Sequence, residues 1–545
     1  MGKLKSRIRQ KLVDVVKFAV REELSAMQSD SQTFINGDKS LEQVEEEIVQ
    51  RLDKQIERWT WERYKRTDSL FDVLGYELKY GVDQGLDKVK KGIEASNSRA
   101  IDEKIKYWTA KRFEQTDKQI ERWTWERYKR SEEKLLYIYK LQNQIAELLF
   151  QQKIIPYKKD EKIRIVFLFQ VASFWPSWES FYKACADDPR IDAKMLFLDE
   201  TVREAVQMKT AKEFLDENKI EYTDFCDFDI DGFKPHVVVV QTPYDAGHRI
   251  KAHWSSSWKA KGYRVVYVPY GIEISDTETS RGMHFEQHVI ENAWRVYTFS
   301  ETMLKDYRKY CVNAGAVRAL GLPKFDSLYH KDEYKLDDDL VKRINGRKVC
   351  LWKVHFPKIF EENGKDIFVT PDLNEYIAFA EYVAQHKDIF FIFMPHPRFQ
   401  EPVKNKTLQQ LAVKLMGILE NENNVYIDTK DDYRYSLMNA DFIIIDRSAV
   451  MVEAAAVGVP VLYMVNSNFY EPVTKAIEPL MDSYEQGSTC EDMVRFTEAC
   501  MRGKDANKEL REKAFEKCIP YFDGKSGERI KEDIVQGVKG VITYE

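Results

Sequence analysis

One stretch of the chain, Asp441–Met464, restricts the possible folds more than any other. An apolar run over Phe442–Ile445 is followed by a helical pattern that opens at Ser448, ends at Gly458 and leads into a second apolar run, Val461–Met464. A strand, a turn, a helix and a second strand in this order predict a piece of parallel sheet. Loops at the carboxyl ends of such strands, backed by a helix N-terminus, are where α/β proteins hold phosphate groups.

Length and composition narrow the class of protein. A chain of 545 residues is too long for a single core, so two or three domains are expected. The net charge of −6 gives no global reason to bind nucleic acid. The seven cysteines include no CxxC pair, which indicates neither a zinc site nor a disulfide framework, and we expect a cytoplasmic protein.

The first 155 residues carry an internal repeat. The sequence DKQIERWTWERYKR occurs at Asp53–Arg66 and again at Asp117–Arg130, with a degenerate copy from Ile105, and the repeats fit blocks of fifteen residues. Fifteen residues in four turns is about 3.75 per turn, close to the 3.6 of a helix, and proline is absent up to residue 155. This pattern predicts a long α-helical, coiled-coil-like region that forms homo-oligomers.

Residues 3–21 are basic and amphipathic. Seven Lys or Arg residues stand against the single Asp14, and apolar residues recur at helical spacing. Such a helix can lie on an anionic membrane surface, which would place the protein peripherally at the inner face of the plasma membrane. The other interpretation is a solvated helix that packs on its own domain.

From residue 163 onward, strand and helix patterns alternate. Strands are predicted at 163–169, 194–198, 237–240, 263–268, 294–299, 347–354, 389–395, 425–427, 442–445 and 461–464, and helices at 202–215, 301–312, 374–386, 408–419, 491–501, 507–518 and 527–538. The pattern predicts an α/β fold with a GT-B-like pair of Rossmann-like domains. The expected boundaries are 1–155 for the helical region, 156–335 for an acceptor domain and 336–545 for a nucleotide donor domain.

Several polar residues follow predicted strands of the second half. Asp446, Arg447 and Ser448 are expected to bind the nucleotide or its phosphates, because a capping serine and a guanidinium would form an anion site at the helix start. His396 stands between two prolines at the end of a strand, with Arg398 close behind, which suits phosphate contact or proton transfer.

Three further sets of residues lie at or after the ends of predicted strands and are candidates for the same site. Lys353 and His355 end the first strand of the second half, and we expect both side chains to lie in the same cleft. The simpler interpretation of each residue alone is a structural role. In the first half, Gly271 follows a strand and would let a ligand approach the backbone, and His284 lies downstream with His288 on the same helical face.

An Asp-x-Asp pattern at Asp227–Asp231 has the spacing of some divalent-metal sites. It directly precedes a predicted strand, as a polar turn does, and we interpret it as a solvated turn. No metal site is predicted from any motif in the chain.

Residues of about 160–520 resemble the CDP-glycerol glycerophosphotransferase family, the teichoic-acid-type polymerases and primases with a GT-B fold. The resemblance rests on FIFMPHPR around His396 and on the segment ADFIIIDRSAVMVEAAAVGVPVLYM from Ala440. Weaker matches are LGLPKFDSL at Leu320–Leu328 and NAWRVYTFSE at Asn292–Glu301.

The resemblance implies a reaction and roles for some residues. In this family an acceptor hydroxyl attacks the β-phosphate of CDP-glycerol and CMP leaves. By resemblance, His396 contacts or protonates the pyrophosphate, Ser448 and neighbouring amides hold phosphate, and Glu453 faces the ribose. Two departures stand out: Ala449 replaces a family serine, and Tyr270 replaces the histidine of the family's HGTP motif.

The missing histidine is a candidate general base, so its role must pass to another group. Glu273, Tyr270 and His284 are the candidates, and Glu273 is favoured. We therefore expect a metal-independent transferase without a cofactor that moves an alditol phosphate from a CDP-linked donor to a polymeric or lipid-linked acceptor in bacterial surface glycopolymer synthesis. The alternatives are a GT-B glycosyltransferase that uses a nucleotide sugar for cell-surface polysaccharide, and a non-catalytic oligomeric scaffold.

Overall fold

The computed structural model describes residues 147, 150–200, 205–357, 359–362, 365–399 and 405–540. The basic segment at 3–21 and the fifteen-residue repeats lie outside these residues, so the helical and oligomeric region stays a prediction. Among the described residues, none of the helices is both long and apolar enough to cross a membrane.

The first half of the described chain forms a parallel sheet covered by helices. Within the described residues this sheet has seven strands in the order β3-β2-β1-β4-β5-β6-β7, and every neighbouring pair is parallel. The strands are β1 Ile163–Phe169, β2 Ile191–Phe197, β3 Thr223–Asp224, β4 Val237–Val240, β5 Arg264–Tyr267, β6 Arg295–Thr298 and β7 Val317–Ala319. The helices are α4 Glu179–Ala186, α5 Ala205–Glu217, α6 Ile230–Phe233, α7 Ser255–Ala260, α8 Glu278–His284, α9 His288–Asn292, α10 Glu301–Tyr310 and α11 Pro323–Tyr329.

The second half repeats this plan. Its sheet, within the described residues, has six parallel strands in the order β12-β11-β8-β13-β14-β15, and a separate antiparallel hairpin, β9–β10, follows β8. The strands are β8 Lys348–Val354, β9 Ile359–Glu362, β10 Lys365–Phe368, β11 Ile389–Pro395, β12 Val425–Ile427, β13 Phe442–Ile445, β14 Val461–Met464 and β15 Glu485–Gly487. The helices are α12 Asp338–Ile344, α13 Leu373–Gln385, α14 Lys406–Leu419, α15 Arg434–Met438, α16 Val450–Val457, α17 Glu478–Met481, α18 Cys490–Met501 and α19 Lys508–Cys518, with α20 Ser526–Lys539 at the end.

Both sheets follow the Rossmann strand order, because the first six strands of each run 3-2-1-4-5-6 when numbered along the chain. The GT-B-like pair of Rossmann-like domains is therefore confirmed. The order reverses between β1 and β4 in the first sheet and between β8 and β13 in the second. Ligands of such sheets bind at the carboxyl ends of the strands beside these two points.

The central strands are apolar because helices cover both faces of each sheet. All residues of β4, β5 and β13 are buried, as expected for strands that have no solvent-facing side. In the sequence such strands appear as continuous apolar runs, so their predicted bounds agree closely with the observed ones.

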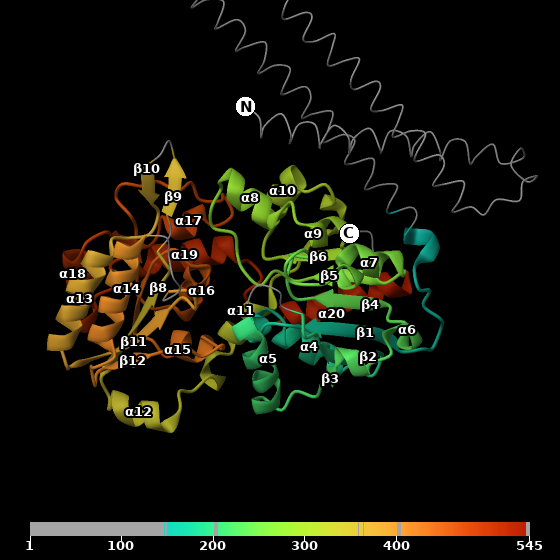
Figure 1. Cartoon of the computed structure of the whole chain (residues 1–545), viewed down its shortest axis with the longest axis horizontal. Coiled ribbons are helices and arrows are strands. Elements are labelled where there is room, and N and C mark those ends of the chain that lie inside the picture. Colours follow the sequence, from blue (N-terminus) through green and yellow to red (C-terminus); the bar gives the residue numbers. More distant parts are fainter. Residues whose placement is uncertain are drawn as a thin grey trace, which may run out of the picture. The chain divides into compact units, whose positions relative to one another are not determined.

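The last helix, α20, packs on the first domain although it follows the second in sequence. It lies beside α4 (Figure 1), and the carboxylate of Asp326 accepts hydrogen bonds from the backbone N–H groups of Ser526 and Gly527, each at 2.8 Å. Arg295 Nε also donates to Asp533 Oδ2 at 3.0 Å. A domain boundary drawn as 336–545 thus includes a terminal helix whose packing partners belong to residues 156–335.

Candidate active site

The carboxyl edge of the second sheet is organised by Asp446, which follows β13 at the switch point. Its Oδ1 accepts the backbone N–H of His355 at 2.7 Å, and its Oδ2 accepts the hydroxyl of Tyr376 at 3.0 Å. Complete burial raises the pKa of Asp446 to about 7. Both oxygens are occupied by the protein, so Asp446 ties the end of β8 to β13 and lies behind the edge. The sequence predicts Asp446 among the nucleotide- or phosphate-binding residues, whereas the structure gives both of its oxygens protein donors.

Two histidines meet at this edge, and their Nδ1 atoms have opposite roles in hydrogen bonding. The rings of His355 and His396 lie 4.9 Å apart between centroids. His355 Nδ1 is 2.8 Å from the carbonyl oxygen of Phe356, which can only accept, so Nδ1 carries the proton. His396 Nδ1 accepts the backbone N–H of Arg398 at 3.1 Å, which leaves the proton of the neutral ring on Nε2.

His396 stays neutral because of its surroundings. Burial, followed by the nearby His355, Lys353 and Arg398, lowers the pKa of His396 to about 3. The Nε2–H of a neutral ring is a hydrogen-bond donor, and a bound anion would raise the pKa of the ring again. The expected pairing of His396 with phosphate is therefore chemically reasonable at this position.

Cationic side chains surround the two rings. Lys353 is 7% exposed, and burial lowers the pKa of its ammonium to about 8, although the nearby carboxylates of Asp446 and Asp428 oppose this shift. The guanidinium of Arg398 lies 4.8 Å from the ring centroid of Phe356, in a cation–π contact. We call Lys353, His355, His396 and Arg398 the cationic edge.

The start of α16 differs in detail from the sequence expectation. The helix begins at Val450 with Ala449 as its N-cap, so Ser448 lies one residue before the cap. Ser448 Oγ still accepts the backbone N–H of Val450, at 3.3 Å. Because alanine offers no side-chain acceptor, Ala449 removes a polar group where the family has a serine.

Arg447 points across to the first domain. Its guanidinium forms an ion pair with Glu471, and its Nη2 donates to Ser275 Oγ at 3.2 Å. Sequence reasoning missed Glu471, which follows β14 in a polar loop, and no spacing signal in the sequence links it to Arg447.

Glu453 lies in the interior and not on an open surface. Only 1% of the residue is exposed, its Oε1 lies 2.6 Å from Lys324 Nζ, and its Oε2 accepts the hydroxyl of Tyr433. This arrangement differs from the expectation that Glu453 faces a ribose. It makes Glu453 half of a buried ion pair that joins α11 to α16.

The first domain contributes Tyr270 and Gly271 after β5. The ring of Tyr270 stacks on Phe174 with centroids 3.9 Å apart, and its hydroxyl lies 3.4 Å from that of Tyr244. Burial holds the pKa of Tyr270 well above its ordinary value, so the hydroxyl keeps its proton at neutral pH and is not a ready base. A Cβ placed on Gly271 would meet no atom within 4 Å, so the backbone there borders open space.

Glu273 has the properties that a base at neutral pH requires. Burial raises the pKa of its carboxyl group to about 7, Glu471 adds to this rise, and Arg447 opposes it. Its Oε1 accepts the backbone N–H of Ser275 at 2.8 Å. Of the three candidates to replace the family histidine, Glu273 alone combines a position at a strand end with a pKa near 7.

His284 is placed in the packing of the first domain. Its Nε2 lies 3.0 Å from the hydroxyl of Tyr307, its ring contacts Phe285, and burial lowers its pKa to about 4. His288 is exposed and begins a separate helix, α9, so the two histidines do not share the helical face that the sequence suggested.

Direct backbone contacts bring Glu273 beside Arg447. The loop after β14 pairs with the segment after β5: Asp276 N donates to Pro472 O at 2.7 Å, and Thr474 N donates to Ile274 O at 2.8 Å. An antiparallel bridge joins Ser275 to Val473. The cationic edge and the carboxylate of Glu273 thus belong to one site built from both domains.

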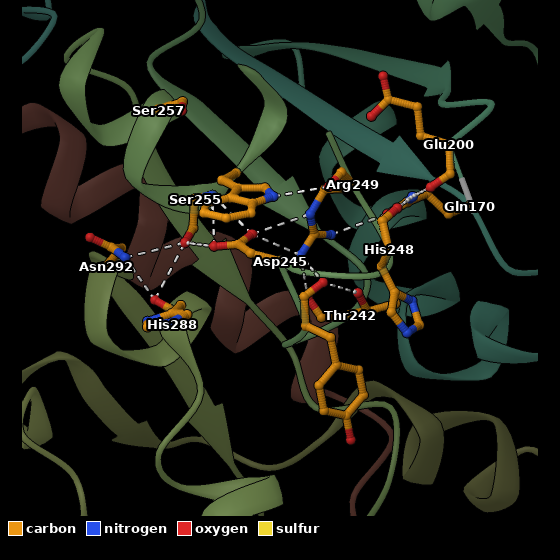
Figure 2. Close-up of polar contacts among 12 residues, drawn as sticks. Gln170, Glu200, Thr242, Asp245, His248, Arg249, Ser255, Ser257, His288 and Asn292 are labelled. Atoms are coloured by element: carbon orange, nitrogen blue, oxygen red, sulfur yellow. Dashed lines mark hydrogen bonds and ion pairs between the residues drawn. The ribbon is translucent and has the colours of Figure 1, made fainter. Parts of the chain in front are cut away.

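A buried polar network supports the first-domain side of the site (Figure 2). Arg249 and Asp245 form an ion pair at 3.2 Å, and Arg249 also donates to Gln170 Oε1 at 3.1 Å and to the carbonyl oxygen of Tyr244 at 3.2 Å. Asp245 Oδ1 accepts the backbone N–H of Ser255 at 3.0 Å. The network fixes the loop after β4, including Tyr244, and its signal in the sequence was the polar run directly after four valines.

The Asp-x-Asp pattern forms a polar turn. Asp229 caps α6 by accepting the backbone N–H of Gly232 at 2.8 Å, and Asp231 pairs with Lys261. Over the described part of the chain, no three His, Cys, Asp or Glu side chains are grouped so that they could hold a metal ion.

Comparisons with known proteins agree with the family resemblance. The sequence model of the CDP-glycerol:poly(glycerophosphate) glycerophosphotransferase family matches residues 279–536, which include the whole cationic edge. No curated protein sequence matches the chain.

Solved structures of similar fold include enzymes of nucleotide-sugar and polymer chemistry. A putative UDP-N-acetylglucosamine 2-epimerase from Listeria monocytogenes is 14% identical, with 70% of this chain and 98% of that chain covered and a TM-score of 0.49. The UDP-GlcNAc 2-epimerase from Neisseria meningitidis bound to UDP-GlcNAc is 13% identical, with 68% and 100% covered and a TM-score of 0.47. A variant of the wall teichoic acid polymerase TagF is 12% identical, with 74% and 94% covered and a TM-score of 0.46.

The sequence resemblance is confirmed by the family match over the part of the chain that carries the donor-side motifs. Residues 279–536 thus match a family of transferases, the CDP-glycerol:poly(glycerophosphate) glycerophosphotransferases.

Proposed function

We propose that the protein transfers glycerol phosphate from CDP-glycerol to a hydroxyl group of a polymeric or lipid-linked acceptor in teichoic-acid-type polymer synthesis. The observation that carries this proposal is the cationic edge, which lies inside the family match; in the same site, Arg447 is close to the carboxylate of Glu273, whose pKa is about 7. Cations and neutral N–H donors suit a diphosphate, and the carboxylate suits a hydroxyl nucleophile.

The reaction assigns one task to each side of the site. The acceptor oxygen forms a bond to the β-phosphorus while the bond from that phosphorus to the CMP oxygen breaks. The hydroxyl proton passes to Glu273, and CMP leaves with the bonding electron pair. Phosphoryl transfer depends mainly on positioning and on stabilisation of charge, which the cationic edge supplies.

Individual groups of the edge have distinct roles in this proposal. His396 donates a hydrogen bond from Nε2 to a pyrophosphate oxygen. Lys353 supplies a positive charge, and because this side chain is buried, its attraction to a phosphate is little screened by water. Arg398 supplies a guanidinium near the same ring, and Arg447 supplies one beside Glu273. The N–H groups at the start of α16 add the positive end of the helix dipole.

Product analysis tests the proposal against sugar transfer. Purified protein is incubated with CDP-glycerol and a membrane extract as the acceptor source, and the products are separated by chromatography and phosphorus NMR. We expect CMP and a new phosphodiester. Release of a nucleoside diphosphate from a nucleotide sugar with formation of a glycosidic bond would support the glycosyltransferase alternative. This alternative is tested because Tyr270 replaces the histidine of the family motif. Absence of turnover with every donor would support the scaffold alternative.

A further inference from the structure

A cavity of about 770 Å³ lies next to the cationic edge, in the second domain. One wall is Pro357, two residues after His355, and another is the loop Val465–Asn468, which continues to Glu471. The remaining walls are the first turns of α13 and α14, the two residues before α18 and the end of β10. The cavity and the site therefore share two loops, and its volume falls in the range of roughly 300–1,000 Å³ that holds small ligands.

Hydroxyl and amide side chains line this cavity without being used by the protein. The side chains of Thr407, Ser467, Asn468 and Ser488 make no hydrogen bond within the described residues. Together they offer donors and acceptors that a ligand with several hydroxyl groups can satisfy. Phe368 is 41% exposed at the end of β10 and adds an apolar ring face.

The charges around the cavity select against an anionic ligand. Its lining contains the carboxylates of Asp372 and Glu375 and, among the described residues, no Lys, Arg or His. Asp372 Oδ1 accepts the backbone N–H of Asn374 at 2.9 Å, and Glu375 Oε2 accepts that of Cys490 at 2.7 Å. These carboxylates already neutralise the positive ends of α13 and α18, so a phosphate would meet negative charge instead of open N–H groups.

We propose that this cavity binds a neutral, hydroxyl-rich unit of the acceptor, either a sugar ring or an acyclic polyol. This inference rests on the proposed function, because it assigns the acceptor's uncharged part to the cavity while the cationic edge holds the donor's diphosphate. The shared loops, Pro357 and Val465–Asn468, then place the bound acceptor beside the donor.

Binding to simple probes tests the inference with the full-length protein. Ribitol and chitobiose serve as neutral probes, the first an acyclic polyol and the second a sugar, and glycerol 3-phosphate serves as the anionic comparison; saturation-transfer NMR measures each affinity. Ser467→Trp and Thr407→Trp fill the cavity from two different walls. Gln410→Trp is the matched control, because Gln410 is exposed on α14 and does not line the cavity.

We expect at least one neutral probe to bind, with about a tenfold loss of affinity in each cavity variant and a change below about twofold in Gln410→Trp. Equal binding by wild type and both cavity variants, or binding of glycerol 3-phosphate alone, would overturn the inference. Calorimetric titration with CDP separates the two proposals: unchanged CDP affinity in the cavity variants shows that they are folded. Failure of CDP to bind wild type contradicts the proposed function and leaves the neutral-probe result standing.

Discussion

The two carboxyl edges of this protein have the same strand order and opposite chemistry. The edge of the second sheet gathers Lys353, Arg398 and two imidazoles, whereas the edge of the first sheet presents Glu273 among tyrosines. In the proposed function, the carboxyl edge of the second sheet holds an anion and that of the first sheet accepts a proton. The difference teaches that the fold supplies the location, while the side chains after each strand decide the chemistry.

The largest expected effect comes from the proton-accepting side. Glu273→Gln keeps the size of the side chain and removes its basicity, so we expect kcat for CMP release to fall by roughly 10²–10⁴. Glu278→Gln, an exposed glutamate of the same segment, is the control and should leave kcat unchanged. A kcat of Glu273→Gln close to that of wild type would assign the base to another group.

The buried ion pair between the domains should govern stability more than chemistry. Lys324→Met leaves Glu453 buried without its 2.6 Å partner, so the free energy of unfolding should drop by about 3–5 kcal/mol. Chemical denaturation measures this change. The exposed Lys342→Met on α12 is the control, and its effect should stay within about 0.5 kcal/mol. If Lys324→Met instead abolished CDP binding in a protein of normal stability, Glu453 would face the ligand as the sequence suggested.

The comparison also predicts how activity depends on pH. The carboxyl group of Glu273 must be ionised to accept a proton, so kcat/KM should rise with pH up to its pKa of about 7. The amino group of Lys353 must carry its proton to attract phosphate, so kcat/KM should fall above its pKa of about 8. Each limb should approach a tenfold change per pH unit.

Lys353→Arg should remove the basic limb because a guanidinium keeps its charge. A basic limb that persists in this variant would exclude Lys353 as its source. His396, with a pKa of about 3, should add no limb near neutral pH in the free enzyme.

The smallest expected effect lies where the two edges meet. Ser275→Ala removes the acceptor of the 3.2 Å hydrogen bond from Arg447, which costs about 0.5–1.5 kcal/mol. The KM for CDP-glycerol should change by roughly two- to tenfold with kcat nearly constant, as steady-state kinetics can measure. A large loss of kcat with an unchanged KM would mean that Ser275 acts in the chemical step.

Much of the fold was readable from the sequence because its central strands are buried on both faces. β1, β4, β11, β13 and β14 begin and end where the apolar runs do, and so does the partly buried edge strand β12. The edge strands β3 and β15 are short and polar and were missed, as was the hairpin β9–β10. The return of α20 to the first sheet depends on tertiary contacts such as Arg295 with Asp533, which no local pattern encodes.

The site was predictable at its strand ends and less so elsewhere. Lys353 lies at the end of β8, and His396 and Glu273 follow β11 and β5, so the sheet order brings them to the two edges. The ion pair of Arg447 with Glu471 and that of Glu453 with Lys324 join residues far apart in the sequence, and neither pair was foreseen. Ala449 as the cap of α16 shows how a shift of one residue changes which group faces a ligand.

Calorimetric titration of CDP into wild type, His396→Ala and Glu273→Gln tests most directly whether one edge binds the nucleotide and the other accepts the proton. We expect CDP to bind wild type and Glu273→Gln with affinities within about threefold, and His396→Ala at least about tenfold more weakly, because of these two side chains the proposal places only His396 on the diphosphate. Equal affinity in wild type and His396→Ala, or loss of binding in Glu273→Gln alone, would contradict the account.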